Sequence, residues 1–312
     1  MATRSEWISA ARPRTLPASI APVIVGLGAA FGMRHFWDEN HPFSPAEIAQ
    51  VGFWHNFSIA RALLAIGVAL ALQIGVNYAN DYSDGIRGTD LERTGPTRLT
   101  ASGKAKPKQV KTAAFTAFGV AGVLGLALAY LAASWGLIVW GALAIAAAWF
   151  YTGGKHPYGY AGLGEVFVFI FFGLVATMGT TYSQLGTITL TSILGAFGTG
   201  FLACAILMVN NIRDIGTDRL AGKLTLAAKL GDTKARKRFM TFIYLAFAFA
   251  FLAAIWITPW AWLTALLLAP AFLITAPVRV GAKGKLLIPV LSGIAKLELA
   301  YALLLGFAFT RL

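Results

Sequence analysis

The chain has 312 residues, of which 57% are hydrophobic and only 12% are charged. Soluble domains are usually about 45–50% apolar and about 25% charged, and one soluble core cannot hide this much apolar surface. The composition therefore argues against a soluble enzyme, a disordered chain, a coiled coil and a disulfide scaffold. A net charge of +13 would suggest nucleic acid as the partner of a soluble chain. In a membrane protein such an excess collects in cytoplasmic loops, so we expect a lipid bilayer and no nucleic acid.

The uncharged runs of the chain predict membrane-spanning helices, each of which needs about 20 apolar residues. Two runs have the length of one span, three have the length of a two-helix hairpin, and a last apolar stretch adds one span. In chain order these segments are 15–33, 62–80, 112–154, 166–212, 239–278 and 286–310. The turn-forming residues at 134–136, 184–189 and 258–260 are the expected breaks of the hairpins. The sequence thus predicts an all-α integral membrane protein with nine transmembrane helices, forming one domain over residues 1–312.

The charges between these spans predict the orientation of the chain. With the N-terminus inside, the inner segments carry 22 Lys and Arg residues, whereas the outer loops and the C-terminus carry three. Because cytoplasmic loops are enriched in Lys and Arg, we expect an N-in/C-out topology in the cell membrane. Two long basic loops, at about 81–111 and 212–238, then face the cytoplasm. We expect the functional site to lie there.

Acidic residues gather where the second and the sixth predicted spans reach these loops. Asn80 precedes Asp84 by four residues, and Asp214 precedes Asp218 by four, so each pair shares one face of a helix. The other acids of the first cluster are Asp81 and Asp90. Because the two clusters follow equivalent spans, the sequence predicts two four-helix pseudo-repeats and an additional ninth helix.

Carboxylates crowded at a membrane boundary repel one another and lose hydration, and a hard divalent cation relieves both costs. Mg²⁺ takes oxygen ligands and commonly joins one or two carboxylates to substrate phosphates. Basic side chains that could clamp a diphosphate lie nearby: Arg87, Arg93, Arg98, Arg213, Arg219 and Lys223. The residues therefore predict a Mg²⁺–diphosphate site between two helix ends. The alternative is that these acids are solvated helix caps or partners of loop arginines.

These residues closely resemble the motifs of the UbiA-type membrane prenyltransferase family, over nearly the whole chain. Its two aspartate-rich motifs are matched by Asn80-Asp81-x-x-Asp84 and Arg213-Asp214-x-x-x-Asp218. Further matches are Arg12-Pro-x-Thr-Leu-Pro17, Gly95-Pro-x-Arg98, Tyr151-Thr-Gly-Gly, Tyr158-Gly-Tyr-x-Gly-Leu-Gly-Glu165 and Gly222-Lys-x-Thr-Leu226. One departure is Asp90, which follows Asp84 by six residues instead of four. This spacing weakens Asp90 as a direct ligand and is typical of the branch that uses 1,4-dihydroxy-2-naphthoate.

The resemblance implies that a polyprenyl group passes from polyprenyl diphosphate to 1,4-dihydroxy-2-naphthoate, with loss of CO₂ and diphosphate, giving demethylmenaquinone. It implies Mg²⁺ as the cofactor, and the implied metal-side residues are Asn80, Asp84, Asp214 and Asp218, with Asp81 and Asp90 next. Arg213 and Lys223 would neutralise the leaving group. The remaining implied substrate-binding residues are Arg87, Arg98, Arg12, Lys155, Tyr151 and Glu165.

Several of these roles have an equally good structural explanation. Arg12 or Lys155 could hold the carboxylate of the acceptor, but both also fit as cytoplasmic anchors. Glu165 could orient or deprotonate a substrate hydroxyl, but a polar residue is also common at the start of a helix. Tyr151 could line the site of the allylic cation, or simply pack.

Three other functions remain to be distinguished. A relative of the same family could use another aromatic acceptor, such as 4-hydroxybenzoate. A transporter would also have repeated halves, but it would place ion-binding groups near the middle of the membrane. Here the acids lie at helix ends on one side. A lipid phosphotransferase would carry Asp-Gly-x-x-Ala-Arg, whereas Asp84-Gly85 continues here as Ile-Arg-Gly.

Overall fold

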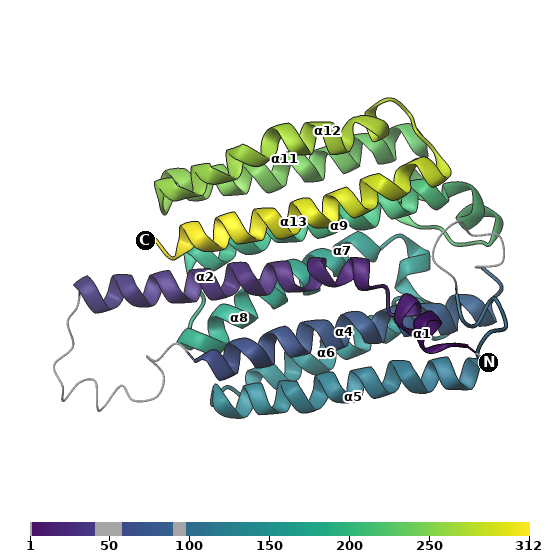
Figure 1. Cartoon of the computed structure of the whole chain (residues 1–312), viewed down its shortest axis with the longest axis horizontal. Helices are drawn as coiled ribbons and strands as arrows, with labels where there is room; N and C mark the ends of the chain where they lie inside the picture. Colours follow the sequence, from purple (N-terminus) through teal and green to yellow (C-terminus); the bar gives the residue numbers. More distant parts are fainter. Residues whose placement is uncertain (1, 41–57, 90–97) are drawn as a thin grey trace.

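The computed structural model describes residues 2–40, 58–89 and 98–312, and every element in them is helical. In chain order the elements are α1 (Arg4–Ala10), η1 (Pro13–Thr15), α2 (Leu16–Asn40), α4 (Ile59–Ile86), α5 (Pro107–Leu131), α6 (Gly136–Phe150), η3 (Tyr158–Ala161), α7 (Gly164–Val168), η4 (Phe169–Val175), α8 (Ala176–Leu185), α9 (Leu190–Leu220), α10 (Leu226–Leu230), α11 (Asp232–Trp256), η5 (Pro259–Leu267), α12 (Leu268–Arg279), η6 (Gly284–Leu287) and α13 (Ile288–Phe309). The long helices lie side by side in one bundle (Figure 1).

The three predicted hairpin breaks are confirmed. α5 gives way to α6 at residues 132–135, α8 to α9 at 186–189, and α11 to η5 at 257–258. Local chemistry explains two of them. Gly186 ends α8 with φ 70°, a conformation that costs glycine little, and Thr189 caps α9 by accepting from the backbone N–H of Ser192. Pro259 begins η5, where its missing N–H is not needed.

Eight helical segments in the described part of the chain are long and apolar enough to cross a membrane. α6 is apolar but has only 15 residues. It ends at Phe150, whereas the uncharged run 112–154 continues for four more residues. The all-helical membrane fold is therefore confirmed at the level of eight candidate spans. The ninth span, the N-in/C-out orientation and the two pseudo-repeats stay predictions.

α9 lies at the centre of the bundle, between α2, α11 and α13 and the π-helical turn η4. Close approach depends on glycine at two crossings. A Cβ on Gly173 of η4 would meet the backbone of Gly200 on α9, and a Cβ on Gly28 of α2 would meet the backbone of Gly306 on α13. Small residues of this kind let helices pack closely where lipid supplies no hydrophobic drive between them.

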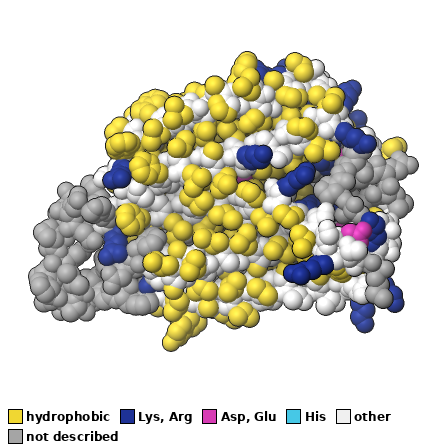
Figure 2. All heavy atoms as spheres, in the orientation of Figure 1, with side chains coloured by type: hydrophobic (Ala, Val, Ile, Leu, Met, Phe, Trp, Pro, Cys, Tyr) yellow, Lys and Arg dark blue, Asp and Glu magenta, His cyan; other side chains and the backbone are white. Residues whose placement is uncertain are grey.

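The bundle has an apolar side surface and a basic end. Hydrophobic side chains cover the middle of the face in Figure 2, and most Lys and Arg side chains of that view gather toward one end. That end is where α4 and α9 finish and where α5 and α11 begin (Figure 1). We call it the basic end; it carries both acidic clusters.

Candidate active site

The last turns of α4 carry the first acidic cluster, and its three polar side chains have different partners. Asn80 accepts a hydrogen bond from the hydroxyl of Thr152, with 2.8 Å between Oδ1 and Oγ1. Asp81 and Asp84 are 1% and 2% exposed, although each is a carboxylate. Because a buried carboxylate needs partners, the surrounding loops must supply them.

Asp84 is held by two groups from distant segments. The hydroxyl of Tyr160 donates to its Oδ1 at 2.8 Å, and the ammonium of Lys223 lies 3.6 Å from its Oδ2. Lys223 also lies over the ring of Tyr160, with 5.1 Å between Nζ and the ring centre. Burial, and then the charge of Asp84, raise the pKa of the Tyr160 phenol. The phenol therefore stays a neutral donor at physiological pH.

Asp81 has a different set of partners. Its two carboxylate oxygens accept the backbone N–H groups of Leu99 and Thr100, at 2.8 and 2.9 Å. The carboxylate thus fixes the loop that follows Arg98, beside the end of α4. In this arrangement both oxygens of Asp81 serve the backbone, in contrast to those of Asp84.

The second cluster lies near the end of α9, where Asp214 is paired with a neighbour on its own helix and Asp218 accepts from the hydroxyl of Thr225, in the loop after α9. Arg213 donates to both oxygens of Asp214 at 2.6 Å each, and to Oδ1 of Asn210 at 2.8 Å. The side chains of Arg213 and Asp214 are 6% and 4% exposed. Asp218 lies one turn further on, where its carbonyl accepts the backbone N–H of Lys223 at 2.7 Å.

Residues 151–163 connect the two clusters. Arg87 donates to the carbonyls of Thr152 and Gly154 and lies 5.4 Å from the ring centre of Tyr160. The carbonyl of Tyr160 accepts the backbone N–H of Leu224 at 3.1 Å. The segment after α6 therefore ties the end of α4 to the loop after α9. Through it the two acidic clusters, 130 residues apart in sequence, form one site.

Tyr151 and Glu165 line the inner side of this connection. Tyr151 is partly buried, and its phenol pKa is raised well above the ordinary value, first by the burial of the ring and then by Glu165, Tyr158, Asp84 and Asp218. Glu165 is 4% exposed at the start of α7, and its Oε1 accepts from the amide of Asn211 at 3.2 Å. Its other oxygen is buried and accepts no hydrogen bond from the described residues.

The other predicted substrate residues lie around this centre. Lys155 is exposed in the turn after Gly154, and Arg12 lies between α1 and η1 with φ 53°. Arg98 precedes the loop that Asp81 holds. Arg219 donates twice to the carbonyl of Ala228 and so fastens α10. Asp90 and Arg93 lie outside the described residues. Within those residues, no three His, Cys, Asp or Glu side chains converge as a preformed metal centre.

Tyr160 and Thr152 were not predicted as site residues, although both belong to segments that match family motifs. Tyr160 contacts both Asp84 and Lys223, and Thr152 contacts Asn80. The sequence contained only a weak indication that Tyr160 and Thr152 belong to the site. Both residues lie in a short polar segment between two apolar helices, and loops of that kind often carry function.

A helical membrane bundle with two acidic clusters joined at one end fits a membrane-embedded prenyltransferase. Residues 42–309 match the model of the UbiA prenyltransferase family, and the chain belongs to that family.

The chain resembles curated relatives over most or all of its length. The chain is 47% identical to a 1,4-dihydroxy-2-naphthoate octaprenyltransferase of Mycobacterium tuberculosis, covering 100% of both proteins. It is 38% identical to a protein of the same name from Escherichia coli, over 74% of this chain and 70% of that protein.

A solved structure shares the fold. A UbiA homologue from Archaeoglobus fulgidus bound to GPP and Mg²⁺ matches with a TM-score of 0.63 at 16% identity, covering 98% of this chain and 100% of that one.

Proposed function

We propose that this chain is a Mg²⁺-dependent polyprenyltransferase that acts on 1,4-dihydroxy-2-naphthoate. The observation that carries the proposal is the contact of Lys223 with Asp84, which brings the two aspartate motifs into one buried, charged site. The relative at 47% identity bears the name of this activity, and the resemblance extends over both proteins.

The residues present fit a metal bridged by a diphosphate better than a metal held by protein alone. The donors are amide and carboxylate oxygens, which suit Mg²⁺, and the described residues contain no group of three or more His, Cys, Asp or Glu that would hold a metal by itself. Lys223 and Arg213 now neutralise Asp84 and Asp214. A diphosphate with Mg²⁺ would give both cations a second anionic partner. The UbiA homologue structure with GPP and Mg²⁺ supports this fit.

In this proposal Asn80, Asp84, Asp214 and Asp218 hold the metal side of the diphosphate, and bound Mg²⁺ supplies positive charge to the leaving group. Asp81 takes a supporting role, because its oxygens hold the loop at 99–100. For Asp90, the proposed role on the metal side rests only on the motif, because Asp90 lies outside the described residues.

Arg213 and Lys223 stabilise the charge that develops on the leaving oxygen, with Arg87 and Arg98 as further diphosphate contacts. The bond between the prenyl carbon and the diphosphate oxygen breaks. A bond forms to the ring carbon that carries the carboxylate, and CO₂ departs, leaving its electron pair in the ring. The product is the reduced form of demethylmenaquinone.

Three residues remain for the acceptor. Glu165 lies beside Tyr151 and is placed to accept a hydrogen bond from an acceptor hydroxyl through its free buried oxygen. Arg12 or Lys155 binds the acceptor carboxylate. The site lies at the basic end, which we assign to the cytoplasmic face of the cell membrane because basic loops stay inside.

A direct assay tests the proposal. Purified protein is incubated with Mg²⁺, a polyprenyl diphosphate and a panel of aromatic acids, and the products are identified by mass. We expect prenylation of 1,4-dihydroxy-2-naphthoate with loss of CO₂, and none when EDTA replaces Mg²⁺. Exclusive transfer to 4-hydroxybenzoate would overturn the acceptor but keep the family. Accumulation of a solute in vesicles without any transfer would favour a transporter.

A further inference from the structure

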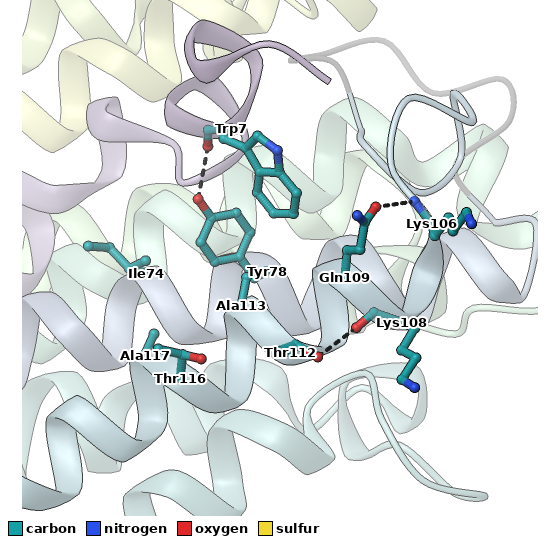
Figure 3. Close-up of a pocket in the computed structure, with 10 residues that line it drawn as sticks. All are labelled: Trp7, Ile74, Tyr78, Lys106, Lys108, Gln109, Thr112, Ala113, Thr116 and Ala117. Atoms are coloured by element: carbon teal, nitrogen blue, oxygen red, sulfur yellow. Dashed lines mark hydrogen bonds between the residues drawn. The ribbon is translucent and has the colours of Figure 1, made fainter. Parts of the chain in front are cut away.

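A lateral groove lies at the basic end, between α1, the second half of α4 and the first turns of α5. Its volume is about 640 Å³. Figure 3 shows Trp7 of α1 and Tyr78 of α4 on one side of the groove and the residues of α5 along the other. The hydroxyl of Tyr78 donates to the carbonyl of Trp7 at 2.9 Å, which fixes α1 against α4.

The groove is separate from the candidate active site. At about 100° per residue along a helix, Asn80 and Asp84 point roughly 200° and 240° away from Tyr78 around α4. Their partners are Thr152, Tyr160 and Lys223, none of which lines the groove. A molecule in the groove would therefore have α4 between itself and Asn80 and Asp84. Asp81, three residues after Tyr78, lies nearer the groove, but both of its oxygens accept from the backbone of Leu99 and Thr100.

The walls of the groove change character along its length. Ile74, Ala113 and Ala117 form an apolar wall toward the middle of the bundle. Lys106 and Lys108 lie at the end of α5 nearest the basic end, and both are exposed. Trp7 and Tyr78 lie on the side of the groove across from α5. In membrane proteins, Trp and Tyr rings are enriched at the interface between lipid tails and headgroups.

The charge at the rim has little internal compensation. Glu6 forms an ion pair with Lys104 at 2.6 Å, and its charge is therefore balanced by Lys104 and not by Lys106 or Lys108. Over residues 2–40, 58–89 and 98–312, neither Lys106 nor Lys108 forms an ion pair. The start of α5 adds a positive helix end to the same rim. Among the described residues, the groove thus has an apolar wall and a cationic rim whose two lysines form no ion pair.

We propose that this groove binds an anionic phospholipid, with one acyl chain against Ile74, Ala113 and Ala117 and the phosphate beside Lys106 and Lys108. A neutral lipid would leave the cationic rim uncompensated, and a small soluble anion would leave the apolar wall bare. Basic pockets between membrane helices are suited to anionic headgroups. The lipid would bridge α1, α4 and α5, and so support the helix that carries Asn80 and Asp84.

Native mass spectrometry of the full-length protein in neutral detergent tests the proposal with phosphatidylglycerol and phosphatidylcholine as probes. We expect retained phosphatidylglycerol and a rise in Tm that phosphatidylcholine does not give. In Lys106→Gln/Lys108→Gln, binding should weaken by roughly 20- to 30-fold, since each lysine near an anionic lipid contributes about fivefold. The matched control is Lys234→Gln/Lys237→Gln, which removes two exposed lysines at the start of α11.

A second variant keeps the charge and fills the apolar wall. Ala117→Phe should reduce phosphatidylglycerol binding while Tm in lipid-free detergent stays near that of wild type, which shows that the variant folds. Equal binding by wild type and both groove variants would overturn the proposal. So would an equal rise in Tm from inorganic phosphate alone, or displacement of the lipid by equimolar polyprenyl diphosphate, which would make the groove a substrate site.

Discussion

The ends of α4 and α9 carry similar acids but bind them in different ways. Asp84 and Asp81 on α4 depend on groups from loops far along the chain, at Lys223 and at residues 99–100. Asp214 on α9 is held by its neighbour Arg213. A carboxylate held within its own helix keeps its partner whenever that helix forms. Asp81 and Asp84, in contrast, acquire these partners only when the loops around the end of α4 are in place.

The largest effect is expected from removing one carboxylate at either end. Asp84→Ala and Asp214→Ala should each lower prenyl transfer by about 10²–10³-fold, because each removes charge at the proposed diphosphate site. Transfer is measured in membranes with Mg²⁺. Similar losses would show that the two ends contribute equally, despite their different partners.

Asp232→Ala is the matched control for this pair. Asp232 forms an ion pair with Arg236 at the start of α11, at the same end of the bundle. Its removal should leave transfer within about a factor of two, since its partner Arg236 belongs to α11 and to neither acidic cluster. Turnover near that of wild type in either Asp84→Ala or Asp214→Ala would refute the assignment of that residue.

A smaller effect is expected at the contact between the two ends. Lys223→Gln removes the cation that faces Asp84 and should lower kcat/KM for the polyprenyl diphosphate by roughly 10- to 100-fold, as loss of a charge-assisted contact does. Lys229→Gln is the control, because Lys229 donates to the carbonyl of Ala161 nearby and forms no ion pair within the described residues. Equal kinetics for the two variants would mean that Lys223 serves only to join the loops.

The membrane helices and the breaks between them could be predicted, because they depend on patterns within short stretches of the sequence. Long uncharged runs gave the membrane helices, and turn residues gave the three breaks. Spacings of four residues gave the two acidic faces. The 15-residue length of α6 was not predictable in this way, since the uncharged run continues past Phe150 into the loop that carries Tyr151 and Thr152.

The roles of individual acids were harder to predict, because they depend on contacts between distant residues. Asp81 and Asp84 lie three residues apart in the same motif, and nothing local distinguishes them. The structure does, because the partners of Asp81 are 18 and 19 residues away and the partners of Asp84 are 76 and 139 residues away. Tyr160 was overlooked for the same reason.

Asp81→Asn sharpens the contrast between those two acids. An amide keeps one oxygen acceptor but presents an N–H₂ group to the other backbone donor, so we expect destabilisation by about 1–3 kcal/mol. Thermal unfolding in detergent measures this. The Mg²⁺ concentration that gives half-maximal transfer should stay unchanged, whereas it should rise in Asp84→Asn. A raised Mg²⁺ requirement in Asp81→Asn would make Asp81 a metal ligand.

The smallest effect is expected at Tyr160, and it depends on pH. Tyr160→Phe removes the donor to Asp84 and should lower transfer by about threefold to tenfold at pH 7.5.

Burial, and then Asp84, raise the pKa of this phenol above its ordinary value of about 10. Below that value the phenol is neutral in the folded and the unfolded chain, so its contribution to stability is fully present. Above it the unfolded chain ionises first, and the contribution is lost as pH rises toward the folded pKa. The difference in Tm between wild type and Tyr160→Phe should therefore stay constant up to about pH 10 and shrink beyond it. A difference that already shrinks between pH 8 and 9 would show that the phenol titrates below its ordinary value, which Asp84 at 2.8 Å should prevent.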